Sequence, residues 1–434
     1  MKTNILIGQS GGPTAAINAS LSGVIREAVK SAGIGGIYGM LNGVEGLLER
    51  KIIDLRKSFK DAEDFGRLAA TPAMALGSCR YKLPPLPPSM PPQAGGSART
   101  PSSAEPPPDA AYGRILQIFR DFGIGMFFYI GGNDSMDTVR QLSAFFRANG
   151  EDVRCVGVPK TVDNDLRVTD HTPGFGSAAK YIACCVAELA LDSSVYDMFN
   201  VIIVEIMGRN AGWLTAAAAL ARDSGCAAPQ LIYLPESPFD PDGFIEKVKA
   251  YSAEKRLLIA AVSEGVRTKD GQYLSAAGAS RDTFGHAALA GAGKYLENLV
   301  KERLGCKVRS IELSVLQRSA GHYASATDIA EAMTIGEEAV RAALAGKTGV
   351  MMTLERVSDE PYLVRCGTAP VEDCANLEKT VPAGWIVDGC DVGAEMLGYL
   401  RPLVKGRARC YEKGGAPEYL FLDKTIAAPA PANE

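Results

Sequence analysis

Hydrophobic and polar positions alternate along this chain on two length scales. Short apolar runs rich in β-branched residues predict buried strands, and longer segments rich in alanine and leucine predict helices between them. The predicted strands are residues 4–8, 126–132, 153–158, 200–208, 230–235 and 256–265, and the clearest helical segments are 178–191 and 210–223. Strands that alternate with helices favour a mostly parallel sheet covered on both faces. The pattern therefore predicts an α/β fold.

Four polar loops end or follow predicted strands. They are SGGPT (10–14), IGGNDS (130–135), PKTVDND (159–165) and MGRN (207–210). In parallel α/β sheets, ligands bind where loops leave the carboxyl ends of the strands. The four loops are therefore candidates for one shared cleft.

One segment interrupts the alternation of strands and helices. Residues 83–110 contain ten of the 25 prolines in the chain. Because proline has no amide hydrogen to donate, such a segment favours extended chain over helix or sheet. We expect it to be an insertion in a loop rather than a domain.

Composition and charge narrow the class of protein. A chain of 434 residues is long enough for two or three domains, and 47% hydrophobic with 22% charged residues is a globular composition. The 46 basic and 50 acidic residues give a net charge of −4, with no basic run to bind a nucleic-acid backbone. No apolar stretch approaches the roughly 20 residues that span a bilayer.

The cysteines and the N-terminus suggest a cytoplasmic protein. Residues 1–12 have the pattern of a strand and a turn rather than of a signal peptide. The ten cysteines form no CxxC pair, and only three histidines are present, so we expect reduced thiols and no zinc site.

Two of the polar loops carry paired glycines. Gly11 and Gly12 allow backbone N–H groups to approach a phosphate at a helix N-terminus, although a plain tight turn explains this pair equally well. Asn133 and Asp134 follow the second pair and could hold magnesium through oxygen atoms, or could cap the next helix. Neither alternative is decided by the loops alone.

The loop at 159–165 places one lysine beside two carboxylates. In an extended chain, Asp163 and Asp165 point the same way and repel each other. Lys160 offsets that repulsion and keeps Asp163 ionised, which makes Asp163 a candidate general base for a hydroxyl group. A solvated charged loop is the alternative.

Three arginines and a glutamate lie at other strand ends or near them. Arg209 follows the predicted strand 200–208, Glu264 lies at the end of the predicted strand 256–265, and Arg309 and Arg318 lie in VRSIELSVLQR (308–318). An arginine can bind a phosphate with two parallel hydrogen bonds. Taken singly, a surface salt bridge is the commoner role for such residues.

Seven motifs occur together and in order along the chain. They are SGGPTAAIN, LGSCR, IGGNDSMDT, PKTVDND, EIMGRNAGW, SEG and VRSIELSVLQR. As a set they resemble the phosphofructokinase family, from residue 1 to about 357 apart from the proline-rich segment. The rest of the chain resembles the extension of longer members.

The resemblance implies a fold and assigns each substrate to a domain. It implies two Rossmann-like three-layer domains with mostly parallel sheets and an active site in the cleft between them. Residues 1–172 would form a donor domain, interrupted by the insertion at 83–110, and residues 173–322 a sugar-phosphate domain. Residues 323–434 would return to the first domain and add the C-terminal extension.

The family transfers a phosphoryl group to the 1-hydroxyl of fructose 6-phosphate with Mg²⁺, and two positions indicate the donor. ATP-using bacterial members commonly carry glycine where this chain has Asp134 and again where it has Lys160. The branch that uses pyrophosphate resembles this sequence at both. A carboxylate at 134 would repel the α-phosphate of ATP, and an ammonium at 160 would neutralise the small, highly charged pyrophosphate.

The resemblance also assigns roles to individual residues. Asp163 would accept the proton of the sugar hydroxyl, Lys160 and Arg209 would neutralise the transferring group, and Asp134 would exclude the nucleotide. The sugar phosphate would be lined by Thr161, Val162, Asp163, Met207, Gly208, Arg209, Glu264, Arg309 and Arg318, with Arg309 reaching in from a neighbouring subunit. The donor phosphates would meet Gly11, Gly12, Arg80 and Lys160, and magnesium would meet Asn133 and Asp165.

Three positions depart from the family pattern. Asn133 is a neutral residue where ATP-using members usually have a metal-binding aspartate. Asn200 stands at the place of a second arginine that often comes from the neighbouring subunit. Val315 aligns with the family histidine, and His322 lies too far along the chain to replace it simply.

The expected protein is therefore a pyrophosphate-dependent phosphotransferase of glycolysis or gluconeogenesis. We expect a cytoplasmic homodimer or homotetramer that binds neither nucleic acid nor membranes. An ATP-dependent enzyme and a non-catalytic regulatory subunit that binds sugar phosphates are the alternatives. Use of other sugar phosphates, such as sedoheptulose 7-phosphate, also stays open.

Overall fold

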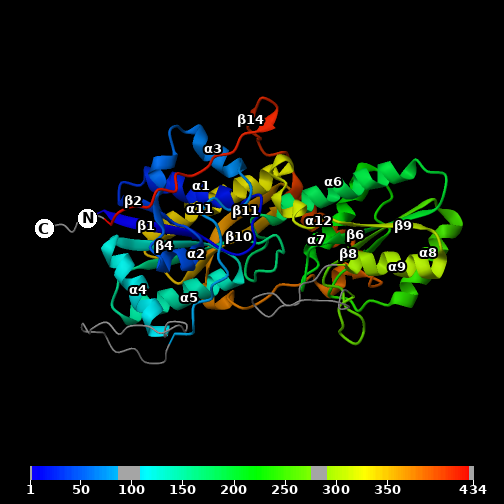
Figure 1. The fold of residues 1–434 in the computed structure, drawn as a ribbon, viewed down its shortest axis with the longest axis horizontal. Coiled ribbons are helices and arrows are strands. Elements are labelled where there is room, and N and C mark those ends of the chain that lie inside the picture. The colour runs from blue at the N-terminus through cyan, green and yellow to red at the C-terminus, as the bar shows by residue number, and fades with distance from the viewer. Residues whose placement is uncertain (1, 87–107, 275–290, 430–434) are drawn as a thin grey trace.

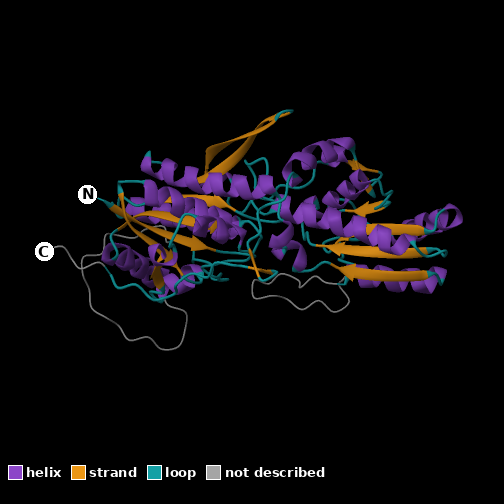
Figure 2. Ribbon diagram, turned by 90° about the horizontal axis from the view of Figure 1, so that it is seen from above, coloured by secondary structure: helices purple, strands orange, loops and turns teal. Residues whose placement is uncertain are grey.

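Helices lie on both sides of the strands in two lobes that follow each other along the long axis of the molecule (Figures 1 and 2). The computed structural model describes residues 2–86, 108–274 and 291–429. The predicted α/β fold with two Rossmann-like three-layer domains is confirmed. None of the helices in the described ranges has the length and apolar composition that crossing a bilayer requires.

The first lobe contains a seven-stranded sheet in the order β11-β10-β5-β4-β1-β2-β3. Its strands are β1 (Thr3–Gln9), β2 (Ile34–Met40), β3 (Ile52–Asp54), β4 (Ile124–Gly131), β5 (Arg154–Pro159), β10 (Val350–Asp359) and β11 (Tyr362–Pro370). Neighbouring strands run parallel except at the two edges, where β3 and β11 are antiparallel. The late strands β10 and β11 therefore return the chain to the first lobe.

Both faces of this first sheet are covered because its strands are apolar on both sides. Ile5 and Ile7 of β1 pack in one core with helices α1 (Ile17–Lys30) and α11 (Ala326–Leu344). Leu6 packs in the opposite core with α4 (Pro108–Asp121) and α5 (Asn133–Ala148). The shorter helices of this lobe are α2 (Gly43–Leu48) and α3 (Glu63–Ala70).

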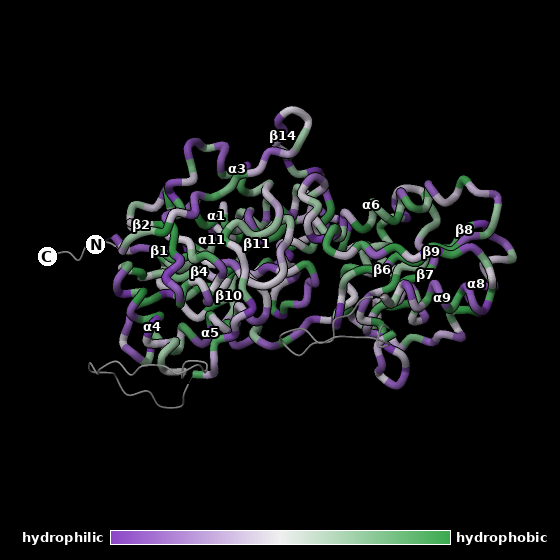
Figure 3. Tube along the Cα trace, in the orientation of Figure 1, coloured by the Kyte–Doolittle hydropathy of each residue, from purple (hydrophilic) through white to green (hydrophobic). Residues whose placement is uncertain are grey.

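The second lobe contains a four-stranded parallel sheet in the order β7-β8-β6-β9. Its strands are β6 (Asn200–Ile206), β7 (Leu231–Tyr233), β8 (Leu257–Ser263) and β9 (Lys307–Glu312). Its helices are α6 (Phe175–Ser194), α7 (Trp213–Ala216), α8 (Pro241–Glu254), α9 (Ala292–Leu304), α10 (Leu316–Ser319) and α12 (Ala394–Leu400). Helix α6 covers one face and helices α8 and α9 the other, and Figure 3 shows hydrophobic segments running through both lobes.

All six strands predicted from the sequence are present, whereas the proline-rich segment needs a correction. Most of the predicted insertion at 83–110 lies outside the described residues. Its last residues are helical instead, because α4 begins at Pro108. Proline is acceptable in the first turn of a helix, where its missing N–H would have no partner in any case.

The chain after β11 crosses from one lobe to the other. Cys374 and Ala375 are buried in the first lobe, and Val381 is buried in the second. We call residues 374–381 the crossing segment. After two short hairpins, β12 (Ile386–Val387) with β13 (Asp391–Val392) and β14 (Glu412–Lys413) with β15 (Ala416–Pro417), the chain pairs again with the first lobe, where Ile426 bridges to Ile53.

Candidate active site

Lys160 follows β5 directly, and its side chain points into the loop after β1. The Nζ atom donates a hydrogen bond of 2.7 Å to the carbonyl oxygen of Gly12, and Lys160 is only 3% exposed. A methyl group on Gly11 would lie 3.0 Å from that Nζ atom, and Gly11 has a φ of +84°. Both the backbone conformation and the close ammonium therefore favour glycine here. We call residues 10–14 the glycine loop.

The glycine loop does not end at a helix N-terminus, as the sequence suggested. Helix α1 begins at Ile17, and the hydroxyl oxygen of Thr14 accepts hydrogen bonds from the N–H groups of Ala16 and Ile17. The first turn of the helix is thus already capped within the chain. Any phosphate at Gly11 and Gly12 would meet loop N–H groups and the Lys160 ammonium instead.

Burial changes the acid–base balance of Lys160. Loss of solvent lowers the pKa of Lys160 to about 8, although the charges of Asp163 and Asp165 oppose that shift. The ammonium is therefore still the main form at neutral pH. A buried cation is costly unless an anion or several acceptors surround it, so this position is suited to an anionic ligand.

Residues 160–166, which we call the carboxylate loop, hold the two aspartates in a turn. The Asp163 N–H group donates to the Thr161 hydroxyl at 3.1 Å. Asn164 has a φ of +54°, so the prediction of extended chain between the aspartates is wrong. Its side chain stabilises this left-handed conformation by donating a hydrogen bond of 2.8 Å to the hydroxyl of Tyr399.

Both carboxylates in this loop are half-buried and bind protons more tightly than usual. Burial raises the pKa of Asp163, and Glu264 raises it further, while Lys160 and Arg209 act in the opposite direction. Burial, together with the charge of Asp163, raises the pKa of Asp165 to about 7. The loop thus holds two electrostatically coupled carboxylates beside a buried ammonium.

The second lobe contributes the loops after β6 and β8. The Gly208 N–H group donates to Oε1 of Glu264 at 3.4 Å, and the Met207 N–H group donates to Oε1 of Gln317 at 3.3 Å. Burial raises the pKa of Glu264, an effect that the Arg209 guanidinium opposes. Because Glu264 and Arg209 both act on the pKa of Asp163, these loops face the carboxylate loop of the first lobe.

Arg318, in the short helix α10, links the two sides. A methyl group on Gly12 would lie 3.2 Å from its Nη1 atom. Burial lowers the pKa of Arg318 while Asp163 and Glu264 raise it. In the described part of the chain, the Nε atoms of Arg209 and Arg318 are buried and have no hydrogen-bond partner. Buried guanidinium donors without acceptors indicate that an anion belongs here.

Comparison with known proteins identifies the family. A profile described as phosphofructokinase matches residues 4–343. The chain belongs to the phosphofructokinase family. It is 41% identical to a pyrophosphate–fructose 6-phosphate 1-phosphotransferase of Xanthomonas campestris pv. campestris (strain B100), over 98% of this chain and 97% of that one. The resemblance inferred from the seven motifs is confirmed.

Two solved structures share the whole phosphofructokinase architecture of this chain. The pyrophosphate-dependent phosphofructokinase of Nitrosospira multiformis has a TM-score of 0.86 and 35% identity and covers 100% of both chains. That of Marinobacter aquaeolei has a TM-score of 0.83 and 36% identity and covers 100% of this chain and 99% of that one.

In this phosphofructokinase, Asp134 and Arg80 lie at the exposed rim of the site. Asp134 is in the first turn of α5 and forms an ion pair with Lys82. The Oδ1 atom of Asp134 is 3.6 Å from the Nζ atom of Lys82. The residue before the helix is Gly132, and no side chain caps it. The alternative in which Asn133 or Asp134 caps this helix is therefore wrong.

Asn133 contacts the crossing segment. With its amide oriented to satisfy its neighbours, its nitrogen donates to the carbonyl oxygens of Cys374 and Leu377, at 3.1 and 3.2 Å. An aspartate could not make these bonds, which gives a structural reason for asparagine at this position. Only the amide oxygen is left for a metal, so Asp165 is the better-suited magnesium ligand of the two predicted.

Three further positions from the sequence analysis have side chains that are exposed or that serve the fold. Arg309 is exposed on the edge strand β9, three residues before that strand ends. The Asn200 side chain is buried and donates to the carbonyl oxygens of Ser193, Met198 and Arg256. Val315 is 50% exposed. Neither Asn200 nor Val315 has a cationic side chain that could bind a phosphate as the family arginine or histidine does.

Two predicted substrate-lining residues have side chains that serve the fold. Val162 is 8% exposed and packs in the core of the second lobe. Thr161 pairs with Gly174 through its backbone and holds Asp163 through its hydroxyl. These two residues would therefore meet a substrate mainly through their backbone.

Sequence reasoning missed several side chains that complete the site. Lys82 and Gln317 stand close to the predicted Arg80 and Arg318, so their motifs carried a usable signal. The sequence gives no such signal for Lys379, because that residue lies in a stretch without a motif. These residues contact the site through Asp134, Met207 and the carboxylate loop, respectively.

A buried charged network lies beyond the carboxylate loop. Nδ1 of His171 is 2.8 Å from Oδ2 of Asp170, and its Nε2 is 2.7 Å from Oε2 of Glu331 in α11. Burial lowers the pKa of His171, but the hydrogen bonds to these two carboxylates outweigh burial and raise it above the usual 6.5. The imidazolium therefore stabilises the folded state below pH 6.5, and this contribution is lost as the pH rises through the higher folded value.

We expect His171→Gln to flatten the pH dependence of thermal stability. The melting temperature of the unmodified protein should fall relative to that of the variant as the pH rises from about 6 to about 9. Differential scanning fluorimetry in matched buffers measures this. His322→Gln, at an exposed histidine, is the control and should follow the unmodified curve. Parallel curves for His171→Gln and the unmodified protein would contradict the prediction.

Proposed function

We propose that this chain is a pyrophosphate-dependent 6-phosphofructokinase. It transfers a phosphoryl group reversibly from pyrophosphate to the 1-hydroxyl of fructose 6-phosphate. The observation that carries the donor assignment is the buried Lys160 ammonium, 2.7 Å from the Gly12 carbonyl in the glycine loop. The names of the Xanthomonas relative and of the two solved structures support the same donor.

The donor is selected by charge and space. The Lys160 ammonium, together with the guanidinium of Arg318 against Gly12, provides compact positive charge for two linked phosphates. Asp134 stands in the first turn of α5 at the rim. Its carboxylate repels the further phosphate that an adenine nucleotide would place there. Lys82 offsets only part of this charge, because the two side chains are exposed and lie 3.6 Å apart, which makes their ion pair weak.

The lobes divide the substrates between them. Residues 1–172 bind the donor through the glycine loop, Arg80 and Lys160. Residues 173–322 bind the sugar phosphate through the loops of Met207, Gly208 and Arg209 and through Glu264, and residues 323–434 return to the first lobe and add the extension. Arg309 is exposed on an edge strand, where a neighbouring copy could meet it, and it binds the 6-phosphate of that copy in a homodimer or homotetramer.

Asp163 acts as the general base. It lies between the Lys160 side and the Glu264 side of the site, and its raised pKa makes it a stronger base than an ordinary carboxylate. As the sugar 1-oxygen attacks the phosphorus atom, Asp163 accepts the hydroxyl proton and phosphate leaves. Lys160 and Arg209 neutralise the charge that spreads over the transferring group.

Magnesium fits the acidic side of this site. Burial raises the pKa of both half-buried carboxylates, and the charge of Asp163 raises that of Asp165 further, so a bound cation would favour their charged forms. Mg²⁺ binds through one or two carboxylates together with substrate phosphates, and within the described ranges no cluster of three His, Cys, Asp or Glu side chains offers a fuller cage. Asp165 would hold the ion, and when bound it supplies further neutralisation of the phosphates.

Initial rates with each donor test this function. We expect the purified protein to phosphorylate fructose 6-phosphate with pyrophosphate, to run the reaction backwards with orthophosphate, and to discriminate against ATP by at least about 100-fold in kcat/KM. Fructose 1,6-bisphosphate is measured by coupled oxidation of NADH. Robust use of ATP with no use of pyrophosphate would contradict the proposal.

A further inference from the structure

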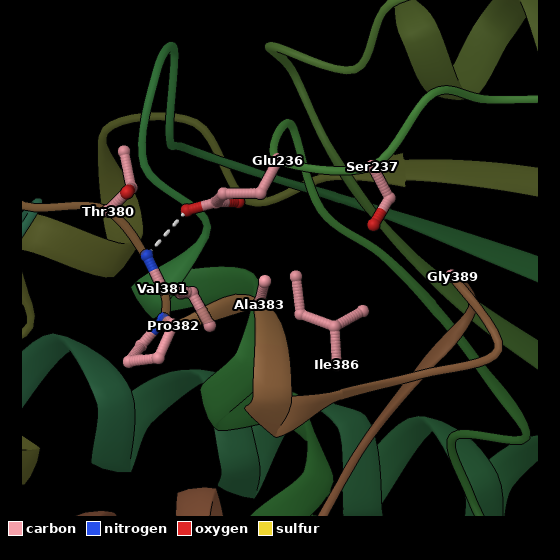
Figure 4. A pocket seen from close by; sticks show the side chains of 8 residues that line it. All are labelled: Glu236, Ser237, Thr380, Val381, Pro382, Ala383, Ile386 and Gly389. Carbon is pink, nitrogen blue, oxygen red and sulfur yellow. Dashed lines mark hydrogen bonds between the residues drawn. The ribbon is translucent and has the colours of Figure 1, made fainter.

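The crossing segment runs along the back of the carboxylate loop. Glu378 forms a β-bridge with Leu166, and the Lys379 N–H group donates to the carbonyl oxygen of Asp165 at 2.7 Å. Further along, the Val381 N–H group donates to Oε1 of Glu236 at 2.9 Å, as the dashed line in Figure 4 shows. The segment is therefore bound to the carboxylate loop at one end and to the second lobe at the other.

The Lys379 side chain ends among acceptors of the carboxylate loop and the residues that follow it. Its Nζ atom donates to the carbonyl oxygens of Asp170 and Thr169 at 2.7 and 3.2 Å, and to Oδ1 of Asn164 at 3.4 Å. An ammonium has three protons to donate, and these three acceptors match them. Burial lowers the pKa of Lys379 to about 8, against the charges of Asp170 and Asp165.

Trp213 fixes Lys379 from the second lobe. The Nε1–H group of Trp213 donates to the Lys379 carbonyl oxygen at 2.9 Å, and the Lys379 ammonium lies 5.3 Å from the centre of the indole ring. A cation at this distance is attracted by the ring face. Backbone and side chain of Lys379 are thus both held before any substrate binds.

Asn164 transmits this position to the reacting groups. It stands between Asp163 and Asp165 in a left-handed conformation, with a φ of +54°. Its side-chain oxygen accepts a hydrogen bond from Lys379, and its side-chain nitrogen donates one to the Tyr399 hydroxyl. The Tyr399 hydroxyl donates in turn to the Asp170 carbonyl oxygen at 2.7 Å. Moving Lys379 would therefore remove one of the two hydrogen bonds that hold the Asn164 side chain, and Asn164 connects the two carboxylates.

We propose that Lys379 is a positioning residue that holds the carboxylate loop in the conformation that presents Asp163 to the sugar hydroxyl. This role rests on the proposed function, because it is expressed through the phosphoryl transfer. Lys379 acts through Asn164 and the loop backbone, so it affects the orientation of the base rather than the binding of either substrate.

The test removes the ammonium and then returns it from solution. Lys379→Ala should lower kcat about 100-fold, since small displacements of a reacting group have effects of this size, while KM for both substrates changes less than about threefold. Ethylammonium chloride should restore kcat about tenfold, because a small primary ammonium fits the vacated space and donates to the same acceptors. Tetramethylammonium chloride at equal ionic strength, which has no N–H to donate, should not. Lys249→Ala, at an exposed lysine of α8, is the control and should behave as the unmodified enzyme.

A second variant keeps the proposal testable if Lys379→Ala does not fold. Asn164→Gly retains the left-handed backbone but removes the link to Lys379 and Tyr399, and it should lower kcat about tenfold with unchanged KM values. Unchanged kcat in either folded variant would overturn the proposal. So would an increase in both KM values without rescue by ethylammonium, which is the behaviour of a residue that only supports the fold.

A wrong donor assignment and a wrong role for Lys379 would give different results. The unmodified protein is assayed first with pyrophosphate and with ATP. If only ATP supports turnover, the proposed donor is wrong, but the Lys379 comparison is then made with ATP, because Asp163 must face the sugar hydroxyl with either donor.

Discussion

Asp163→Asn is expected to lower kcat about 1,000-fold without weakening the binding of fructose 6-phosphate, in the range that loss of a general base produces. Asparagine has nearly the shape of aspartate but cannot accept the hydroxyl proton. The side chain accepts a hydrogen bond of 3.5 Å from the Thr161 hydroxyl and lies in the field of Lys160, Arg209 and Glu264, so removing its charge leaves the surrounding groups in place. Steady-state kinetics gives kcat, and isothermal titration calorimetry gives the affinity for the sugar phosphate.

The same variant separates an enzyme from a regulatory subunit. A regulatory protein would bind fructose 6-phosphate equally well with and without the substitution, and neither form would show turnover. Asp197→Asn, at an exposed residue, serves as the control and should leave kcat unchanged. A kcat of Asp163→Asn within about tenfold of the unmodified enzyme would contradict the role of Asp163 as base.

Lys160→Gly is expected to lower kcat/KM for pyrophosphate by a factor of about 100 to 1,000, the size of effect seen when one charged or hydrogen-bonding group at a transferring centre is removed. The KM for fructose 6-phosphate should change little, because the Lys160 ammonium donates to the glycine loop, which is assigned to the donor. Initial rates at varied pyrophosphate and saturating sugar phosphate measure the effect.

Two further variants show that charge rather than volume is responsible. Lys160→Met keeps the length of the side chain and removes its charge, so it should behave like Lys160→Gly. Lys51→Met, at an exposed lysine, should match the unmodified enzyme. A rate with pyrophosphate that is unchanged in Lys160→Met would show that the ammonium does not neutralise the donor.

The strands of this fold could be read from the sequence because the central strands are buried on both faces. Runs such as residues 126–131 and 257–262 are therefore continuously apolar, a signal that needs no knowledge of distant contacts. Strand β2 was not predicted, because the glycines in IGGIYGM dilute the apolar run. The start of α4 was misplaced for a related reason: Pro108 looks like part of the proline-rich segment but occupies a position where a helix accepts proline.

The parts of the site that lie in one short motif could be predicted from the sequence. The parts whose geometry depends on distant segments could be predicted only in part. Lys160 and Asp163 lie within four residues of each other, so their proximity is visible in the sequence. The turn at Asn164 depends on Tyr399, and the amide of Asn133 depends on the carbonyl oxygens of the crossing segment. No local pattern indicates that a segment more than 200 residues later in the chain supports the carboxylate loop.

The central claim is that a buried ammonium and a rim carboxylate select pyrophosphate over ATP, and direct competition between the donors tests it. Fructose 6-phosphate is incubated with the protein, magnesium and equal concentrations of both donors, and the mixture is followed by ³¹P nuclear magnetic resonance. The account predicts that the pyrophosphate signal declines and orthophosphate and the 1-phosphate of the product appear, while the three ATP signals keep their intensity. Conversion of ATP to ADP with pyrophosphate left intact would contradict it.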